Sequence, residues 1–478
     1  MCGRVWVLLL VAARLRCGSF SMIESRLSMP PALRRSIGLS HATALVVGII
    51  VGASIFIQPS EITRLIPSTG GVMLVWLAAG ALTLCGALVC AELASVFPHT
   101  GGVYVFLKEI FSPVLGFLWG WAMFWSVHSG ILAAIAVILA RYIAYFVPLG
   151  ESAIRAVAIA AILLLSLINY LGVKLGSAVQ LALTAAKLAA IVLMVVLLFW
   201  FGGAAHRALP VQTAFAAGAA LQSYGLAIAA GLFAFGGWHM VTYAAGETRE
   251  PERTIPRALM AGTLIVTACY VLLNAGYLYV LPLGEVAHST RVAAEATGRA
   301  LGARAGGAIA VLVVLSALGA LNGIILAGPR VYYAMAQDGL AFRWMGAVHP
   351  RRQTPHLALL AQALWSSVLV ATNSYRELFT RVVYTEWLFF ALLAAGLFVL
   401  RRKGLRRQQQ EYKPVFRAGG YPVLQAVFIA ASVGIVVNQW VADPRGSAVG
   451  LGLLLLGLPV YFVWSRRVPK EALTDAHH

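Results

Sequence analysis

The chain has 478 residues, of which 60% are hydrophobic and 11% charged, and its formal net charge is +19. A soluble domain carries about 25% charged residues, so this composition excludes an ordinary soluble fold. In lipid, only helices and closed barrels satisfy all their backbone polar groups. The apolar runs are continuous rather than alternating, which favours an all-α membrane protein over a barrel.

The first 34 residues are considered apart from the rest. The apolar run from Val5 to Ala13 is too short to span a bilayer and has some features of a signal peptide. Because Met22 and Met29 both precede the polar stretch PPALRRSIG, we expect residues 1–34 to be a cytoplasmic segment that includes a non-native extension.

Five cysteines are present, and three of them lie inside apolar runs. The odd number and these positions indicate neither a disulfide framework nor a zinc site, so no metal or other cofactor is expected. The five are Cys2, Cys17, Cys85, Cys90 and Cys269.

Runs of about 20 apolar residues can cross a bilayer, and the chain contains twelve candidates. They lie near 40–66, 71–97, 113–147, 153–171, 177–201, 223–245, 256–282, 304–334, 356–373, 379–400, 421–441 and 446–464. With the N-terminus inside, the basic residues gather on the cytoplasmic side, as in the run RRKGLRR that begins at Arg401. We therefore expect a multi-pass protein of the cell membrane with both termini cytoplasmic. Its basic excess would contact anionic lipid rather than nucleic acid.

Spans 1 and 6 carry glycines where a plain helix would avoid them. Gly48 and Gly52 interrupt the first, and Gly236 and Gly237 lie in the middle of the sixth. Such glycines permit local unwinding, although a G-x-x-x-G pair can also simply allow close helix packing.

The two interrupted spans are five apart, which favours unwinding over packing. Interrupted segments at matching places in two halves point to the binding site of an inverted-repeat transporter. The predicted organisation is a first repeat at 35–202, a second at 203–400, two further helices at 401–464 and a cytoplasmic tail at 465–478.

Several motifs resemble the amino acid–polyamine–organocation superfamily, most closely its L-type amino acid transporter branch. Span 1 reads GIIVGASIF, and the end of span 2 reads CAELASVFPHTGGVYVFLKE. Span 6 and its exit read LFAFGGWHMVTYAAGETREPERTIPRAL, and span 8 reads SALGALNGIILAGPRVYYAMAQDGL, followed by HPRRQTP. The resemblance covers about residues 35 to 400.

This resemblance implies a LeuT-like fold: a five-plus-five inverted repeat with broken helices 1 and 6 and two extra C-terminal helices. An amino acid substrate would place its carboxylate on free N–H groups where span 1 breaks, as an anion does at a helix N-terminus. Its ammonium group would meet carbonyls at the ends of the half-helices. The N–H donors would be Gly52, Ala53 and Ser54, and the carbonyls those of Ile50, Phe233 and Gly236.

The resemblance also makes Phe233 an aromatic gate over the substrate, and we expect Phe235 to add to the apolar wall. Two residues depart from the family pattern. Ser54 stands where glycine is common, and its hydroxyl could donate one more hydrogen bond. His239 stands where many relatives have asparagine; it could tune selectivity or the response to pH, or it could be packed with a satisfied hydrogen bond.

Four charged residues fall inside predicted spans, where an ionisable group is costly. We expect Glu92 and Glu386 to be solvated near the interface and Arg141 to reach it by snorkelling. Lys187 is too deep in span 5 for that. The resemblance places it where sodium-coupled relatives hold an ion, with Ser316 as an oxygen partner, so we expect Lys187 to replace sodium.

The expected function is sodium-independent exchange of neutral L-amino acids by alternating access, with proton-coupled symport as the alternative. A membrane-embedded enzyme is disfavoured because no aspartate lies in a span, and His128 and His239 stand alone. An ion channel would need a symmetric filter or ringed charges. Since no predicted outer loop contains cysteine, no disulfide-linked accessory subunit is expected.

Overall fold

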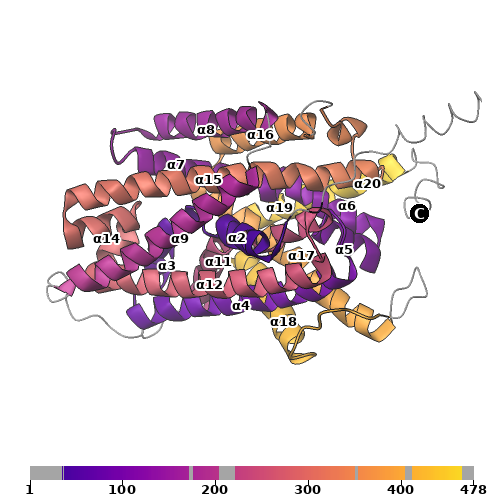
Figure 1. Ribbon diagram of the computed structural model, residues 1–478, viewed down its shortest axis with the longest axis horizontal. Coiled ribbons are helices and arrows are strands. Elements are labelled where there is room, and N and C mark those ends of the chain that lie inside the picture. The colour runs from indigo at the N-terminus through magenta and orange to yellow at the C-terminus, as the bar shows by residue number, and fades with distance from the viewer. Residues whose placement is uncertain are drawn as a thin grey trace, which may run out of the picture. The chain divides into compact units, whose positions relative to one another are not determined.

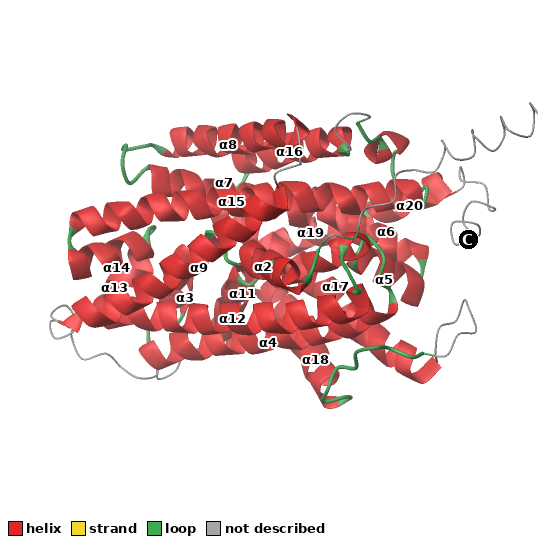
Figure 2. Ribbon diagram, viewed as in Figure 1, coloured by secondary structure: helices red, strands yellow, loops and turns green. Residues whose placement is uncertain are grey.

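The computed structural model describes residues 35, 37–171, 176–203, 221–349, 354–403 and 412–465. These residues are nearly all helical (Figure 2). An isolated β-bridge joins Ile37 to Thr248. Ten of the described helical stretches are long and apolar enough to cross a membrane, and two shorter apolar helices accompany them. The all-α membrane protein is therefore confirmed, while the number of twelve spans stays a prediction. The predicted N-terminal segment and most of the tail lie outside the described residues.

The helices keep the labels of Figure 1. In chain order the α-helices are α2 (Leu39–Ile50), α3 (Gln58–Leu65), α4 (Thr69–Val96), α5 (Val103–Ile110), α6 (Pro113–Ala122), α7 (His128–Ile143), α8 (Glu151–Leu171), α9 (Gly176–Phe201), α11 (Leu221–Ala234), α12 (Pro251–Val280), α13 (Leu283–His288), α14 (Val292–Leu301), α15 (Ala303–Gln337), α16 (His356–Thr372), α17 (Tyr375–Lys403), α18 (Val423–Ala442), α19 (Pro444–Leu455) and α20 (Gly457–Ser465). Short 3₁₀ segments are η1 (Ser54–Phe56), η3 (Trp238–Glu247) and η4 (Arg343–Gly346), and η2 (Met123–Val127) is one π-helical turn.

Helix starts follow simple chemical signals. Proline opens α6, α12 and α19, where its missing N–H costs nothing and its fixed φ suits the first turn. Ser68 caps α4 by accepting a hydrogen bond from the N–H of Gly71 at 3.2 Å. The third span runs through α6, η2 and α7 without a gap, and the sequence did not predict α13 and α14 between spans 7 and 8.

The side chains that face outward are those expected for a protein surrounded by lipid. Large apolar side chains such as Leu164 on α8, Trp200 on α9 and Leu364 on α16 are more than half exposed. Large apolar side chains exposed in such number are unusual on a soluble monomer. The broken helix α2 instead packs against α9, α12, α15 and η3 (Figure 1), and its last turn from Val46 to Ile50 is buried.

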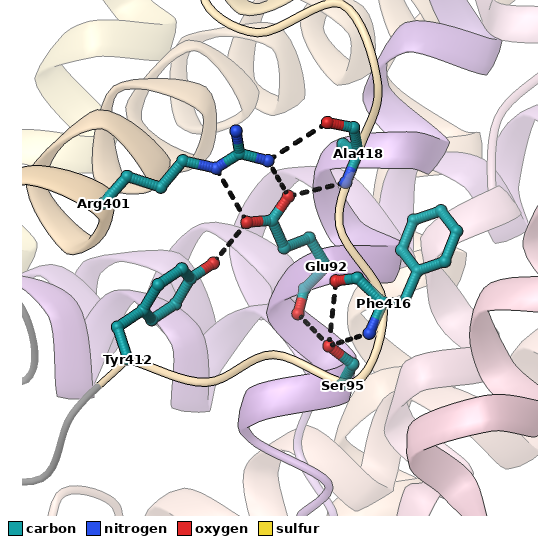
Figure 3. A network of polar contacts seen from close by, with 6 residues as sticks. All are labelled: Glu92, Ser95, Arg401, Tyr412, Phe416 and Ala418. Atoms are coloured by element: carbon teal, nitrogen blue, oxygen red, sulfur yellow. Dashed lines mark hydrogen bonds and ion pairs between the residues drawn. The ribbon is translucent and has the colours of Figure 1, made fainter.

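Near the end of α4, a buried carboxylate ties distant segments together (Figure 3). Glu92 is 0% exposed and accepts hydrogen bonds from Arg401 of α17, from the Tyr412 hydroxyl and from the backbone N–H of Ala418. Ser95 bonds the backbone of Phe416 in the same segment. The expectation that Glu92 would be solvated at the interface was therefore wrong, because chain beyond α17 folds over it.

Changing Glu92 to glutamine is expected to lower the melting temperature of the detergent-solubilised protein. The amide leaves Arg401 without its counter-charge and turns one acceptor into a donor, a loss of about 1–3 kcal/mol. The matched control is Glu285→Gln, which breaks an exposed pair with Arg299 worth about 0–1 kcal/mol. Equal shifts in the two variants would contradict this role for Glu92.

Candidate substrate site

The first break in the bundle separates α2 from η1. Helix α2 ends at Ile50, and the N–H of Gly52 turns back to the Ile50 carbonyl at 2.6 Å. Among the described residues, the N–H groups of Ala53, Ser54 and Ile55 donate to no backbone carbonyl. Free N–H groups at the start of a helical segment form a ready anion site, so this geometry suits a carboxylate.

The second break separates α11 from η3. Helix α11 ends at Ala234, and η3 begins at Trp238 after Gly237, whose φ of +91° is left-handed and favours glycine. A Cβ added at Gly237 would come within 2.5 Å of Ile49 Cγ2 on α2. The two breaks therefore touch each other, at the places where the glycines predicted them.

A small cavity of about 20 Å³ lies between the breaks. Both broken helices line it, together with side chains of α7, α15 and α17. The lining residues are Ile49, Ile50, Gly52, Ser54, Ile131, Ile135, Phe233, Ala234, Gly236, Gly237, Met240, Ile324 and Val382. Its wall carries no ionised side chain, and its volume has room for little more than one water molecule. An amino acid would need the helices around it to move apart.

Five of the residues proposed to bind substrate are in this lining, and three are not. Ile50, Gly52, Ser54, Phe233 and Gly236 line the cavity. The other three are buried elsewhere: Ala53 in the core, Phe235 against Trp76 and Tyr270, and His239 close to Glu386.

Tyr270 of α12 links the two breaks and was not found from the sequence. Its hydroxyl oxygen lies 2.8 Å from the Ile50 carbonyl and 3.1 Å from the Ala234 carbonyl, so its single proton is shared between, or alternates between, the ends of both half-helices. The Ile50 carbonyl also accepts from the N–H of Gly52, so it has two donors within reach for its two lone pairs. In this arrangement Phe233 and Gly236 offer the more available carbonyls for an ammonium group.

Aromatic rings cover one side of the cavity. Phe233 packs on Phe379 and Tyr375 of α17 with ring centroids 5.6 and 6.4 Å apart, and Arg141 lies 5.7 Å from the Tyr375 ring. Toward the other end of η3, Arg330 of α15 pairs with Glu247 at 3.1 Å. Contacts between α11 and α17 therefore close one side of the cavity, and the Arg330–Glu247 pair joins η3 to α15 beyond it.

Lys187 lies beside the first break. Its side chain is 4% exposed, and Nζ is 3.5 Å from the Gly48 carbonyl and 3.4 Å from the Val51 carbonyl. These carbonyls end α2, where the helix dipole favours a positive charge. Ser316 of α15 lines the same crevice, and its buried hydroxyl has no hydrogen-bond partner among the described residues.

Two expectations about buried charges were wrong. Glu386 is 3% exposed rather than solvated, because α17 begins several residues before the predicted span and so carries Glu386 deeper, next to His239. His128 and His239 do not stand alone either. Both rings contact Tyr243, and His239 Nε2 lies 3.9 Å from Glu386 Oε1.

Comparisons with known proteins agree with this geometry. The family model described as amino acid permease matches residues 37–464. The serine/threonine exchanger SteT of Bacillus subtilis (strain 168) is 30% identical over 91% of this chain and 98% of its own. The b(0,+)-type amino acid transporter 1 of Homo sapiens is 29% identical over 94% of this chain and 93% of its own. The large neutral amino acids transporter small subunit 2 of Rattus norvegicus is 30% identical over 92% of this chain and 83% of its own.

The match extends over nearly the whole of the chain and includes both broken helices. It decides between the transporter and the membrane-embedded enzyme considered from the sequence. The chain belongs to the amino acid permease family and is a multi-pass membrane protein that transports amino acids.

Proposed function

We propose that this protein exchanges neutral L-amino acids across the cell membrane by sodium-independent alternating access. The observation that carries the proposal is the cavity between two helix breaks, which has free N–H groups on one side and carbonyls on the other. These groups suit the two poles of a zwitterion. Since the lining holds no carboxylate, a cationic side chain would be buried without a counter-charge, which is costly.

The names of two relatives support exchange and neutral substrates. One is called a serine/threonine exchanger and the other a large neutral amino acids transporter. Proton-coupled symport is the alternative mode. It is favoured by the buried ionisable groups Lys187, His239 and Glu386, which could take up protons during the cycle.

Counterflow in proteoliposomes tests the proposal. Vesicles loaded with each unlabelled amino acid in turn would be offered the labelled one, with and without sodium and with and without a pH gradient. Saturable, stereoselective counterflow of alanine, serine or leucine, unchanged when choline replaces sodium, is expected. Robust lysine or arginine transport with weak transport of these three would contradict the neutral selectivity.

Phe233→Ala is expected to lower the turnover number about tenfold and to change the half-saturating concentration much less. Phe233 contacts Phe379 and Tyr375 as the cover of the cavity, so its loss removes contacts worth about 0.5–1.5 kcal/mol per ring pair in the closed form. Exchange kinetics at several substrate concentrations measure both constants. Phe462→Ala, on an exposed position of α20, is the control, and weaker binding with unchanged turnover in Phe233→Ala would contradict the gate.

The proposal includes two inverted five-helix repeats and cytoplasmic termini, supported by the five-span spacing of the breaks and by the loop charges. It also includes function without a disulfide-linked partner. The described cysteines Cys85, Cys90 and Cys269 lie within α4 and α12 and are unpaired. Some relatives are named small subunits, so counterflow by the purified chain alone tests this point.

A further inference from the structure

A buried acid–base pair joins the second break to α17. His239 follows the break by two residues and is 0% exposed, and its Nε2 lies 3.9 Å from Oε1 of Glu386, which is 3% exposed. Neither histidine nitrogen nor this carboxyl oxygen has a hydrogen-bond partner among the described residues. Two unpartnered polar groups that face each other in the core need an explanation that packing alone does not give.

Rings and weakly polar groups surround the pair. Trp119, Trp238 and Phe390 contact the imidazole of His239. The titratable neighbours are His128 of α7 beside His239, and Tyr243 of η3, which contacts both histidines and also interacts with Glu386. Beyond Tyr243 lie Cys90 of α4 and Tyr332 of α15. Within the described part of the chain, no lysine or arginine pairs with Glu386.

The charge balance of this site depends on one proton. With a single proton, the pair is either a neutral acid beside a neutral imidazole or a carboxylate beside an imidazolium, and its net charge is zero. Losing that proton leaves a buried negative charge without a counter-ion, and gaining a second leaves a buried positive charge. Either change is costly in an apolar site.

We propose that His239 and Glu386 form a proton-binding site that must hold one proton for the closed transporter to form. The inference rests on the proposed function, because it assigns a requirement of the transport cycle. On the other side of the break, Phe233 of α11 packs on Phe379 of α17, so the broken helix meets α17 both before the break, through α11, and after it, through η3. Motion of the broken helix relative to α17 opens the pair to water, and closing buries it again with its proton.

Equilibrium exchange of labelled L-serine, or of the neutral amino acid with the fastest counterflow, tests the proposal at equal pH on both sides of the vesicle. The maximal rate of the unchanged protein is expected to fall about fivefold or more between pH 7 and pH 9 as the pair loses its proton, because burial disfavours the charged form that this loss creates and so holds the proton on until alkaline pH. In Glu386→Gln and Glu386→Met, which cannot ionise, the rate should change less than about twofold over this range. The half-saturating concentration should not follow the fall, because neither side chain lines the cavity.

Glu377→Gln is the matched control, since Glu377 is an exposed carboxylate on the same helix, and it should keep the profile of the unchanged protein. His239→Asn should shift the alkaline fall by about one pH unit or more, which gives a second test if the Glu386 variants do not fold. A flat profile in the unchanged protein overturns the proposal, and so does an unaltered fall in the Glu386 variants or in His239→Asn. Absence of any counterflow would instead count against the proposed function.

Discussion

Replacing Gly236 with leucine is expected to abolish amino acid exchange while the protein still inserts and folds. Gly236 lines the cavity between the breaks, and a Cβ there would meet the Phe233 carbonyl at 3.0 Å and no other atom within 4 Å. The leucine side chain would therefore project into the space that we assign to the substrate ammonium group. A hydrogen bond to a charged group is worth about 1.5–3 kcal/mol, so losing this contact alone lowers binding about 10- to 100-fold.

Counterflow and size-exclusion chromatography of the same preparation measure transport and folding separately. The matched control is Gly434→Leu on α18, where an added Cβ meets nothing within 4 Å. It should fold and exchange like the unchanged protein. Exchange by Gly236→Leu at more than about a tenth of the control rate would show that this space is not used by the substrate.

The breaks could be predicted because their cause is local. The glycines that permit unwinding are visible in the sequence, and Gly237 takes the left-handed conformation that glycine allows. The depth of Lys187 in span 5 was equally readable, and its ammonium group lies beside the carbonyls that end α2. Position along one helix was enough for these inferences.

Other features could not be predicted because they depend on which distant segment comes to lie alongside. Glu92 is near a helix end, yet Arg401 and the segment after it bury the carboxylate completely. For Glu386, the partner His239 comes from another part of the chain. The Tyr270 hydroxyl lies within hydrogen-bond distance of the ends of both half-helices, but nothing in the sequence distinguishes this tyrosine from others in apolar runs. Depth in a span was therefore a poor guide to solvation.

Lys187→Ala is expected to lower exchange about tenfold or more. Exchange by the unchanged protein is expected not to depend on sodium. The ammonium group is buried near two carbonyls at the end of α2, with the Ser316 hydroxyl in the same crevice. A positive charge there offsets the partial negative charge of the helix end, which is the electrostatic work that we assign to it in place of a sodium ion. Without it, the broken helix loses the charge that holds its end against α9.

The side chain's charge and its bulk can be separated experimentally. Lys187→Met keeps most of the length and loses the charge, and it should be as impaired as Lys187→Ala, whereas Lys187→Arg should retain part of the activity. Exchange by the unchanged protein should be equal in sodium and choline. Sodium-stimulated uptake, or full activity of Lys187→Ala, would overturn this role.

Lys187 could act with a permanent charge or by releasing a proton in each cycle, and the two cases predict different responses to a proton gradient. A lysine that stays charged acts as a strut, and accumulation should then respond little to a proton gradient. A lysine that releases its proton in each cycle, as desolvation favours, should give gradient-driven accumulation that Lys187→Met abolishes. In the second case Glu386→Gln should leave that accumulation in place, because its carboxyl group lies in a different cluster from the crevice at Lys187. Measuring accumulation in Lys187→Met and in Glu386→Gln therefore shows whether the lysine or the acid–base pair carries the proton.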